Sequence, residues 1–314
     1  MNFSLIVPAH NASRTIGRCL EAIFNSDFKN FEVVVIDDAS NDPTVEIAKK
    51  FPCRIVGTEK RLGTHHIRNM AKDESRYDTL VYIDSDILIK PDTLSKIEHS
   101  FREEPGVAAV VGVLSKEHPS NGYFSQYKNL YMHYILNKCP RYVDFIYGSI
   151  YAIKKQYFQE CWSLGRFAED TDLGMRLSQQ NLKILLNKDI EVVHLKEYSF
   201  ISFLQNDFTI PYYWAKIFIR QRGWVSLAKK KRFSHARLSQ IVSIILAGAT
   251  LPLLFVNPLI SALLVILFLF VNSRFLIFLY RQQGAFFAIR AVFLTWLDML
   301  VMLFGIICGF IIWF

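Results

Sequence analysis

The stretch TLVYIDSDILI, residues 79–89, joins an apolar run to a pair of carboxylates. Its first half is rich in β-branched and aromatic side chains, which is typical of a strand buried within a parallel sheet. Asp84, Ser85 and Asp86 follow this run directly. Since ligands of open α/β sheets bind beyond the carboxyl ends of the strands, the stretch predicts a buried strand that leads into a functional loop.

The chain on both sides of this stretch repeats the pattern. From residue 3 to about 115, short β-branched runs alternate with helical patterns, as in a mostly parallel sheet with helices on both faces. The expected strands are FSLIVP, FEVVVID, CRIVG, TLVYID and VAAVVGVL, and the expected helices cover residues 13–26, 43–51, 63–73 and 91–103. The predicted fold class is therefore α/β.

Residues 116–198 have a looser pattern, which looks like substrate-specifying structure added to a nucleotide-binding half. The expected elements are a helix at 121–138, a strand near IYGSIYAI, a helix from about residue 170, and short strands near LKILL and EVVHL.

The last part of the chain, residues 238–314, is an apolar tail whose only charged residues are Arg274, Arg281, Arg290 and Asp298. Apolar runs at 239–256, at 259–271 with an extension to 280, and at 291–314 predict three membrane spans. The first two runs are short for a bilayer, so a re-entrant hairpin or a two-span arrangement is the alternative. Asp298 inside the last run is a functional candidate, expected to contact a lipid headgroup or Arg290, or to lie hydrated near the interface.

A basic segment precedes this tail. Residues 208–237 carry eight Lys or Arg and no Asp or Glu, and an anionic membrane leaflet would attract such a cluster. The membrane, and no nucleic acid, is therefore the predicted partner of the basic surplus. Residues 200–224 have an aromatic helical pattern that predicts an interfacial helix, with a core-packing helix as the alternative.

The cysteines and the start of the chain bear on the compartment. Cysteines at positions 19, 53, 139, 161 and 308 are scattered and form no C-x-x-C pair, so neither a disulfide framework nor a zinc site is indicated. The start MNFSLIVPAHN has no basic leader, and Pro8 breaks its apolar run, so it does not resemble a secretory signal. The soluble part is expected in a reducing cytosol.

Acidic residues end two of the predicted strands. Asp37 and Asp38 follow FEVVVI, where a carboxylate accepts hydrogen bonds from ribose hydroxyls or a base N–H, although such residues also cap ordinary turns. Asp84 and Asp86 suit a hard divalent cation, Mg²⁺ or Mn²⁺, whose remaining ligands are phosphate oxygens of the substrate.

Six short strings follow one another along the chain: P-A-H-N, V-I-D-D, G-T-H-H-I-R-N, D-S-D, Y-G-S and A-E-D-T-D-L. In this order and spacing they resemble the family 2 inverting glycosyltransferases of GT-A fold, over roughly residues 3–195. The resemblance implies a Rossmann-like GT-A domain that binds a nucleotide-diphospho-sugar, UDP- or GDP-linked. The motifs also exclude a dinucleotide-dependent oxidoreductase, because no G-x-G-x-x-G follows the first predicted strand.

The resemblance also implies which residues bind the nucleotide. It implies that Asp38 binds the base of the nucleotide. It also implies that Arg68 contacts a phosphate or the nucleotide base, with a solvated charge on a helix as the alternative for Arg68. The nucleotide-binding residues implied in this way are Pro8, Ala9, Asn11, Asp37, Asp38, Gly63, Arg68, Asp84 and Ser85.

The metal ligands implied by the resemblance are Asp86 first, Asp84 second and His194 third. His194 ends the predicted strand EVVHL, where some GT-A enzymes supply a metal ligand, and a structural histidine is the alternative. The ion, Mn²⁺ or Mg²⁺, would stabilise the departing diphosphate.

The resemblance places the catalytic residues in FAEDTDLGMRL. Glu169 and Asp170 resemble the E-D pair of the family, whose Asp takes the proton of the acceptor hydroxyl as general base. The alternative for Asp170 is a helix cap, and Asp172 is expected to pair with Arg176 one helical turn later.

Gly148 and Ser149 resemble the small-residue turn beside the donor sugar. Ser149 stands where a second glycine is more usual in the family, which is a mild departure from the pattern.

The acceptor is expected to be lipid-linked, either a polyprenyl phosphate or a hydroxyl of a glycolipid. The E-D pair favours a hydroxyl, because a phosphate is already ionised and needs no base. Processive synthases of the family carry Q-x-x-R-W, whereas residues 221–224 read Q-R-G-W, so single addition is expected. The alternatives are a processive polysaccharide synthase, a soluble acceptor, and a catalytically silent membrane scaffold.

The predicted organisation has three parts. Residues 1–198 form a GT-A catalytic domain, with a nucleotide-binding half at 1–115 and an acceptor and donor-sugar half at 116–198. Residues 199–237 form a basic interfacial segment, and residues 238–314 form the membrane domain. The protein is expected in a bacterial-type inner or plasma membrane, with the catalytic domain in the cytosol, in the synthesis of a cell-envelope glycan or glycolipid.

Overall fold

The computed structural model describes residues 1–158 and 169–312, and the chain divides into two compact units. The sheet unit comprises Met1–Ser120 and Leu136–Lys196, and the helical unit comprises Asn121–Ile135 and Glu197–Phe314. Each unit is described by itself. Cys161 and Ala168, which the sequence motifs include, lie outside the described residues.

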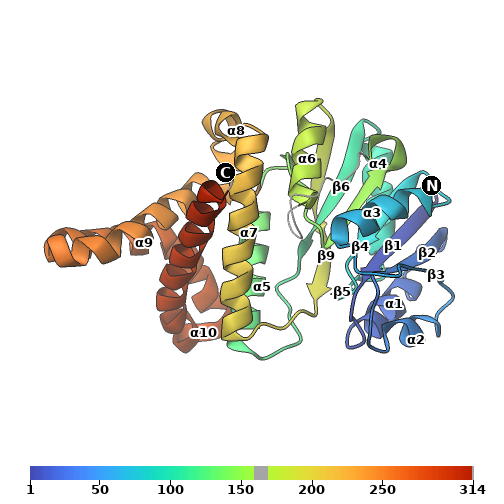
Figure 1. The fold of residues 1–314 in the computed structure, drawn as a ribbon, viewed down its shortest axis with the longest axis horizontal. Coiled ribbons are helices and arrows are strands. Elements are labelled where there is room, and N and C mark those ends of the chain that lie inside the picture. Colours follow the sequence, from blue (N-terminus) through green and yellow to red (C-terminus); the bar gives the residue numbers. More distant parts are fainter. Residues whose placement is uncertain (159–168, 313–314) are drawn as a thin grey trace. The chain divides into compact units, whose positions relative to one another are not determined.

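The sheet unit is built on a mixed sheet that has nine strands in the described part of the chain (Figure 1). The strands are β1 (Phe3–Ala9), β2 (Phe31–Asp37), β3 (Arg54–Gly57), β4 (Thr79–Ile83), β5 (Ile87–Leu88), β6 (Val107–Leu114), β7 (Tyr142–Val143), β8 (Ile150–Lys154) and β9 (Lys183–His194). Their order is β3-β2-β1-β4-β8-β6-β9-β5, and β7 pairs with β9.

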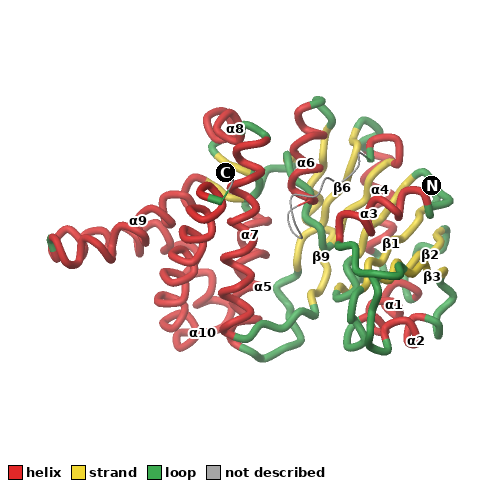
Figure 2. The backbone as a smooth tube through the Cα atoms, viewed as in Figure 1, coloured by secondary structure: helices red, strands yellow, loops and turns green. Residues whose placement is uncertain are grey.

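The helices of this unit alternate with the strands along the chain, as Figure 2 shows in red and yellow. They are α1 (Ile16–Phe24), α2 (Thr44–Ala48), α3 (Thr64–Asp73), α4 (Thr93–Glu103) and α6 (Glu169–Gln179), with a 3₁₀ turn η1 (Lys155–Tyr157). The predicted alternation over residues 3–115 is confirmed, and the α/β fold class with it.

The parallel strands bring their carboxyl ends to one edge. In the ladder of β1, β2 and β3, Ala9 lies opposite Asp37, and Asp37 lies opposite Gly57. Strand β8 enters the sheet antiparallel, between β4 and β6, with Ile83 opposite Ile150. The loops that follow β2 and β4 and the loop that precedes β8 therefore meet at the same edge of the sheet.

The prediction of two short strands near LKILL and EVVHL is wrong, because β9 is a single long strand that covers both segments. Strand β6 pairs in parallel with both halves of β9, and the register shifts between Val111 and Val113. The polar residues 187–189 lie in the resulting bulge. They interrupt the apolar pattern, and for this reason the local sequence reads as two strands.

The helical unit contains α5 (Tyr123–Asn137) up to Ile135, α7 (Phe200–Arg220), α8 (Gly223–Lys230), α9 (Leu238–Val256), α10 (Pro258–Ile311) and a small hairpin of β10 (Arg232–Phe233) and β11 (Ala236–Arg237). Asn257 caps α10, because its side chain accepts a hydrogen bond from the Ile260 N–H at 3.2 Å. Helix α10 is interrupted at Gly284, whose φ of 82° lies outside the helical region.

Two helices, α9 and α10, are long and apolar enough to cross a membrane by length and composition. Large apolar side chains point outward along both, including Phe255, Leu259 and Phe270, which are 86%, 83% and 76% exposed. The break at Gly284 falls between the second and third of the predicted spans. The three-span arrangement stays a prediction.

Helix α7 packs closely on the last part of α10. A Cβ atom at Gly305 would lie 2.3 Å from the carbonyl oxygen of Phe208, and one at Gly309 would lie 2.3 Å from that of Tyr212. The two glycines are four residues apart, as are the two carbonyls, so a small-residue stripe admits the backbone of α7. The buried face of α7 includes Phe203, Asp207, Pro211, Ala215 and Ile217.

A mutation at this contact should destabilise the helical unit. Replacing glycine by alanine inside a helix normally stabilises it, but at Gly309 the added methyl group must displace a backbone carbonyl. Gly309→Ala is therefore expected to cost about 1–3 kcal/mol, which thermal unfolding in detergent measures. Gly106→Ala is the control, because nothing lies within 4 Å of a Cβ atom there. A higher melting temperature for Gly309→Ala would contradict this packing.

The helical unit also holds a buried ion pair between Lys128 of α5 and Asp207 of α7. Asp298 is fully buried beside them, next to Asp207 and Tyr127. Arg290 instead stacks on the ring of Tyr123, with 4.1 Å between its guanidinium carbon and the ring centroid. The structure therefore places Asp298 inside the helical unit, and the hydrated alternative for Asp298 is wrong.

Candidate active site

The loop after β2 is tied to the start of α3 through Asp38. The Asp38 carboxylate accepts hydrogen bonds from the backbone N–H groups of Leu62 at 2.6 Å and Gly63 at 2.9 Å. Gly63 has a φ of 92° and precedes the first residue of α3, so this turn needs a residue without a side chain. Asp38 is only 5% exposed, and in this structure its carboxylate holds the loop together.

Further residues predicted for the nucleotide lie at the carboxyl ends of β1 and β2 and in the loop after β1. Asn11 follows β1 with a φ of 51°, and its side-chain oxygen accepts from the Asn41 N–H at 2.9 Å. Asp37 accepts from the Ser40 N–H at 3.0 Å. Pro8 and Ala9 end β1, beside Ile36 and Asp37 of β2. These residues shape the edge of the sheet at the ends of β1 and β2.

Arg68 of α3 is buried at the centre of the site, only 3% exposed. Its Nη1 donates to Glu169 Oε1 at 2.9 Å, and its Nη2 lies 3.5 Å from Asp84 Oδ1. The Nη2 also donates to the carbonyl of Gly148 at 3.4 Å. The alternative of a solvated helix charge is therefore wrong, because Arg68 joins the loop after β4 to the start of α6.

Gly148 lies between Arg68 and Asp170. Its N–H donates to Asp170 Oδ2 at 2.7 Å, and a Cβ atom at position 148 would lie 2.8 Å from both Asp170 Oδ2 and Arg68 Nη2. The other carboxylate oxygen of Asp170 accepts from the Thr171 N–H at 2.7 Å. Since any side chain would separate these groups, the close approach requires glycine.

Ser149 is buried next to this point, 7% exposed, and its carbonyl accepts the Asp84 N–H at 3.2 Å. This bond follows from the β4–β8 pairing, which places the residues after Ile83 opposite those before Ile150. Ser85 lies in the turn between β4 and β5. The loop after β4 is thereby held against the loop before β8.

Asp86 and His194 meet at the end of the small ladder between β5 and β9. His194 pairs with Ile87, and its Nε2 lies 3.3 Å from Asp86 Oδ2. Burial opposes ionisation of Asp86, but the charge and hydrogen bond of His194, together with the charge of Lys196 and a backbone hydrogen bond, hold the Asp86 pKa below its usual value. At Asp84, burial raises the pKa to about 6, although Arg68 acts in the opposite direction.

These residues fit a divalent cation. Two carboxylates and a neutral imidazole are a donor set that Mn²⁺ accepts, and the side chains of Asp86 and His194 already lie in contact. Within residues 1–158 and 169–312, no three His, Cys, Asp or Glu side chains form a ready-made metal cluster. In proteins, phosphate oxygens of a substrate and water commonly supply the remaining ligands of Mg²⁺ and Mn²⁺.

Two tyrosines, which the sequence analysis did not identify, contact Arg68. The Tyr82 hydroxyl donates to the Arg68 carbonyl at 2.9 Å, and the guanidinium carbon lies 5.7 Å from the centroid of the Tyr151 ring. The two rings stack with centroids 4.7 Å apart. Their partnership depends on the antiparallel pairing of β4 with β8, which local sequence patterns do not reveal.

The start of α6 confirms a further expectation. Arg176 Nε donates to Asp172 Oδ2 at 2.9 Å, four residues apart on the helix. Asp172 is fully buried, so this pair fixes the helix that carries Glu169 and Asp170.

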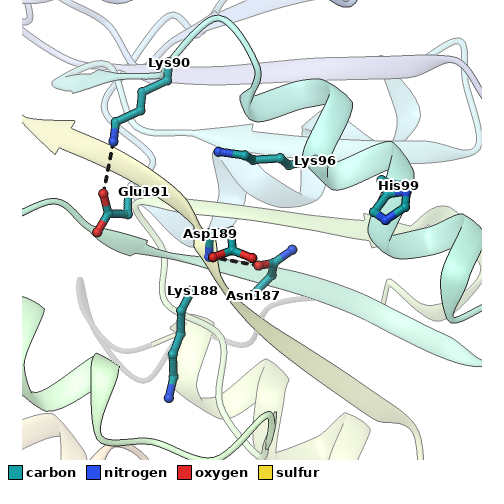
Figure 3. Close-up of a pocket in the computed structure, with 7 residues that line it drawn as sticks. All are labelled: Lys90, Lys96, His99, Asn187, Lys188, Asp189 and Glu191. Atoms are coloured by element: carbon teal, nitrogen blue, oxygen red, sulfur yellow. Dashed lines mark hydrogen bonds and ion pairs between the residues drawn. The ribbon is translucent and has the colours of Figure 1, made fainter.

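A separate pocket of about 500 Å³ lies in the sheet unit (Figure 3). Lys90 reaches Glu191 across it, with 3.0 Å between the ammonium nitrogen and the carboxylate oxygen. Its lining residues are Lys90, Lys96, His99, Asn187, Lys188, Asp189 and Glu191. None of the residues predicted for the active site lines this pocket. The positively and negatively charged side chains that line it are nearly equal in number.

Comparison with known sequences identifies related proteins. The family model described as glycosyl transferase family 2 matches residues 4–162, half of the chain. An uncharacterized glycosyltransferase of Haemophilus influenzae is 26% identical over 182 residues, which cover 56% of this chain and 62% of that protein. A poly(ribitol-phosphate) β-N-acetylglucosaminyltransferase of Staphylococcus aureus is 34% identical over 101 residues, 30% of this chain and 18% of that protein. The chain spans less than two thirds of the length of either relative.

Comparison with solved structures shows the fold. A mannosyltransferase from Pyrobaculum calidifontis, in complex with GDP-mannose and Mn²⁺, matches with a TM-score of 0.59 and 17% identity, over 99% of this chain and 86% of that one. The glucosyl-3-phosphoglycerate synthase of Mycobacterium tuberculosis, with Mn²⁺, UDP and phosphoglyceric acid, matches with a TM-score of 0.52 and 16% identity, over 70% of this chain and 78% of that one. The predicted GT-A type of α/β fold is confirmed.

Proposed function

The chain belongs to glycosyl transferase family 2, and from that premise we propose that it is a membrane-anchored inverting glycosyltransferase. It moves a sugar from a nucleotide-diphospho-sugar to a lipid-linked acceptor in a single displacement. The observation that carries this proposal is a series of direct contacts: Asp84 contacts Arg68, Arg68 contacts Gly148, and Gly148 contacts Asp170. It brings together the acid of the donor side and the base of the acceptor side, which lie 86 positions apart (170 − 84) in the sequence.

The donor binds at the edge of the sheet where β1, β2 and β4 end. The loops that follow β1 and β2, with Asp37 and Asp38 at the end of β2, face the nucleoside, and the turn of Asp84 to Asp86 faces its diphosphate. A divalent cation held by Asp84, Asp86 and His194 would neutralise the charge that develops on the diphosphate as the glycosidic bond breaks. The buried guanidinium of Arg68 adds a fixed positive charge on the same side.

Asp170 is the general base of this proposal. Each of its oxygens accepts one backbone N–H, from Gly148 and Thr171, so the carboxylate is oriented while each oxygen keeps a lone pair for the acceptor proton. Its place in the first turn of α6 favours a negative charge there. A base of this kind suits an acceptor hydroxyl, because a phosphate acceptor attacks without losing a proton.

The acceptor is lipid-linked in this proposal because the same chain carries membrane-binding features. The basic residues of 208–237 and the outward-facing apolar side chains of α9 and α10 would hold the catalytic residues near a bilayer surface. A membrane-bound site meets lipid-linked acceptors at high effective concentration without any new contact.

Donor binding gives a direct test that needs no knowledge of the acceptor. The full chain in detergent is heated with UDP- and GDP-linked sugars, each with and without Mn²⁺. The matching donor is expected to stabilise the protein by about 2.7 kcal/mol at 100 times its Kd, and only with the cation present. Chelation with EDTA should remove this stabilisation. A protein that no nucleotide sugar stabilises would instead support the catalytically silent scaffold.

A further inference from the structure

Glu169 and Asp170 are neighbours in sequence but have different surroundings. Glu169 is 6% exposed, and its carboxylate contacts the Arg68 guanidinium. Burial raises the pKa of Glu169 to about 7, although the charge of Arg68 acts in the opposite direction. Asp170 is less buried, and among residues 1–158 and 169–312 its carboxylate accepts hydrogen bonds from two backbone N–H groups. The acceptor can therefore reach Asp170 more readily than Glu169.

The two terminal nitrogens of Arg68 also differ. Nη1 makes a short bond to Glu169 at 2.9 Å, within the usual range for N–H···O bonds. Within the part of the chain that the structure describes, the contacts of Nη2 are long, 3.4 Å to the Gly148 carbonyl and 3.5 Å to Asp84 Oδ1. Nη2 therefore keeps hydrogen-bonding capacity on the side of the Asp84 loop, while Nη1 is committed to Glu169.

The position of the Arg68 guanidinium depends mainly on its hydrogen bond to Glu169, because the neighbouring tyrosines restrain it less. Tyr82 fixes only the backbone carbonyl of Arg68, and Tyr151 supports the flat face of the guanidinium. Rotation in the plane of that face is limited by the bond to Glu169. A guanidinium with one nitrogen anchored in this way presents the other in a fixed direction.

We infer that Glu169 is a positioning residue, which holds the Arg68 guanidinium so that Nη2 binds the diphosphate of the donor beside Asp84. This inference rests on the proposed function and gives Glu169 a different role from the catalytic one that the E-D motif predicted. Asp170 alone then touches the reacting acceptor. Glu169 acts through Arg68, and its loss weakens donor binding.

The experiment measures binding of UDP and of GDP, each with Mn²⁺, to the full chain by isothermal titration calorimetry in detergent. Glu169→Gln keeps the size of the side chain and removes its charge, whereas Glu169→Asp keeps the charge and shortens it. Glu169→Gln is expected to weaken binding about tenfold, the loss of one charge-assisted contact, with Glu169→Asp closer to the parent. Asp189→Asn, at an exposed position away from these contacts, should bind like the parent.

A double substitution separates positioning from independent contact. Arg68→Met should weaken binding at least as much as Glu169→Gln, and Arg68→Met with Glu169→Gln should be no weaker than Arg68→Met alone. Parent-like binding by Glu169→Gln, additive losses in the double variant, or better binding by Glu169→Gln than by Glu169→Asp would each overturn the inference. A simple packing role for Glu169 predicts that last ranking.

The result also separates this inference from the proposed function. A parent chain that binds neither nucleotide diphosphate with Mn²⁺ would overturn both. A parent chain that binds one of them, with Glu169→Gln binding equally well, would overturn only the positioning role. An irreversibly unfolded fraction lowers only the stoichiometry that calorimetry reports, and a reversibly unfolded fraction raises the apparent Kd in proportion to the loss of folded protein, which a melting curve of each variant measures.

Discussion

Asp170→Asn is expected to lower the rate of sugar transfer about 10³-fold while leaving donor binding unchanged, because it removes only the proton acceptor. The asparagine side chain has nearly the same shape, and its oxygen can keep the hydrogen bond from the Gly148 N–H. It cannot take a proton from the acceptor hydroxyl. The measurement is release of nucleotide diphosphate by the full chain in liposomes, with membrane lipids as the source of acceptor.

Asp189→Asn is the matched control for this variant. It makes the same chemical change at an exposed position beside the pocket of Figure 3, away from the Arg68 contacts. The control is expected to turn over at the parental rate. Equal rates for Asp170→Asn and the parent would remove Asp170 as the base, and would favour an acceptor phosphate that attacks without one.

Asp86→Ala is expected to have the second large effect, a loss of turnover on the order of 10³-fold at limiting Mn²⁺, which corresponds to about 4 kcal/mol of lost leaving-group stabilisation. Asp86 and His194 already lie 3.3 Å apart, so one cation can bind both side chains, and for this reason Asp86 is the carboxylate tested first. Raising the Mn²⁺ concentration should recover part of the rate, because Asp84 and His194 remain.

The readout is the rate as a function of Mn²⁺ concentration, with Asp189→Ala as the control for removing an exposed carboxylate. The Mn²⁺ concentration for half-maximal rate should rise in Asp86→Ala and stay unchanged in the control. A variant with the parental Mn²⁺ dependence would show that Asp86 does not bind the metal.

Much of the sheet could be predicted from the sequence because its information is local. The alternation of β-branched runs and helical patterns fixed the strands β1, β2, β3, β4 and β6, and the acids after β2 and β4 marked the functional edge. The antiparallel entry of β8 and the continuity of β9 could not be read in the same way. Both depend on pairing with strands far away in the chain, which leaves no periodic mark on the sequence.

The candidate site shows the same division. The strings that contain Asp84, Asp86 and Asp170 identified the chemistry, but no string indicated that Arg68 is buried between them. The contact of Arg68 with Glu169 spans 101 positions and exists only because α3 and α6 meet at one edge of the sheet. Likewise, no string indicated that the Asp38 carboxylate accepts hydrogen bonds from the N–H groups of Leu62 and Gly63, and its contact with the nucleobase stays a prediction.

The helical unit illustrates how composition alone misses packing. The basic and aromatic pattern of residues 200–224 predicted an interfacial helix with a core-packing helix as the alternative, and α7 does pack on α10 at Gly305 and Gly309, but the pattern did not identify this partner. A pair of glycines in an apolar run marks a close contact only when the partner helix is known. The interfacial role of residues 199–237 stays a prediction, which the Gly309→Ala test does not address.

The most direct test of the whole account is a density map of the full chain bound to its nucleotide diphosphate and Mn²⁺. The account predicts the nucleoside at the loops that follow β1 and β2, the metal against Asp86 and His194, and the diphosphate within reach of Arg68 Nη2. Nucleotide density elsewhere, for example in the pocket beside Lys90 and Glu191, would contradict it.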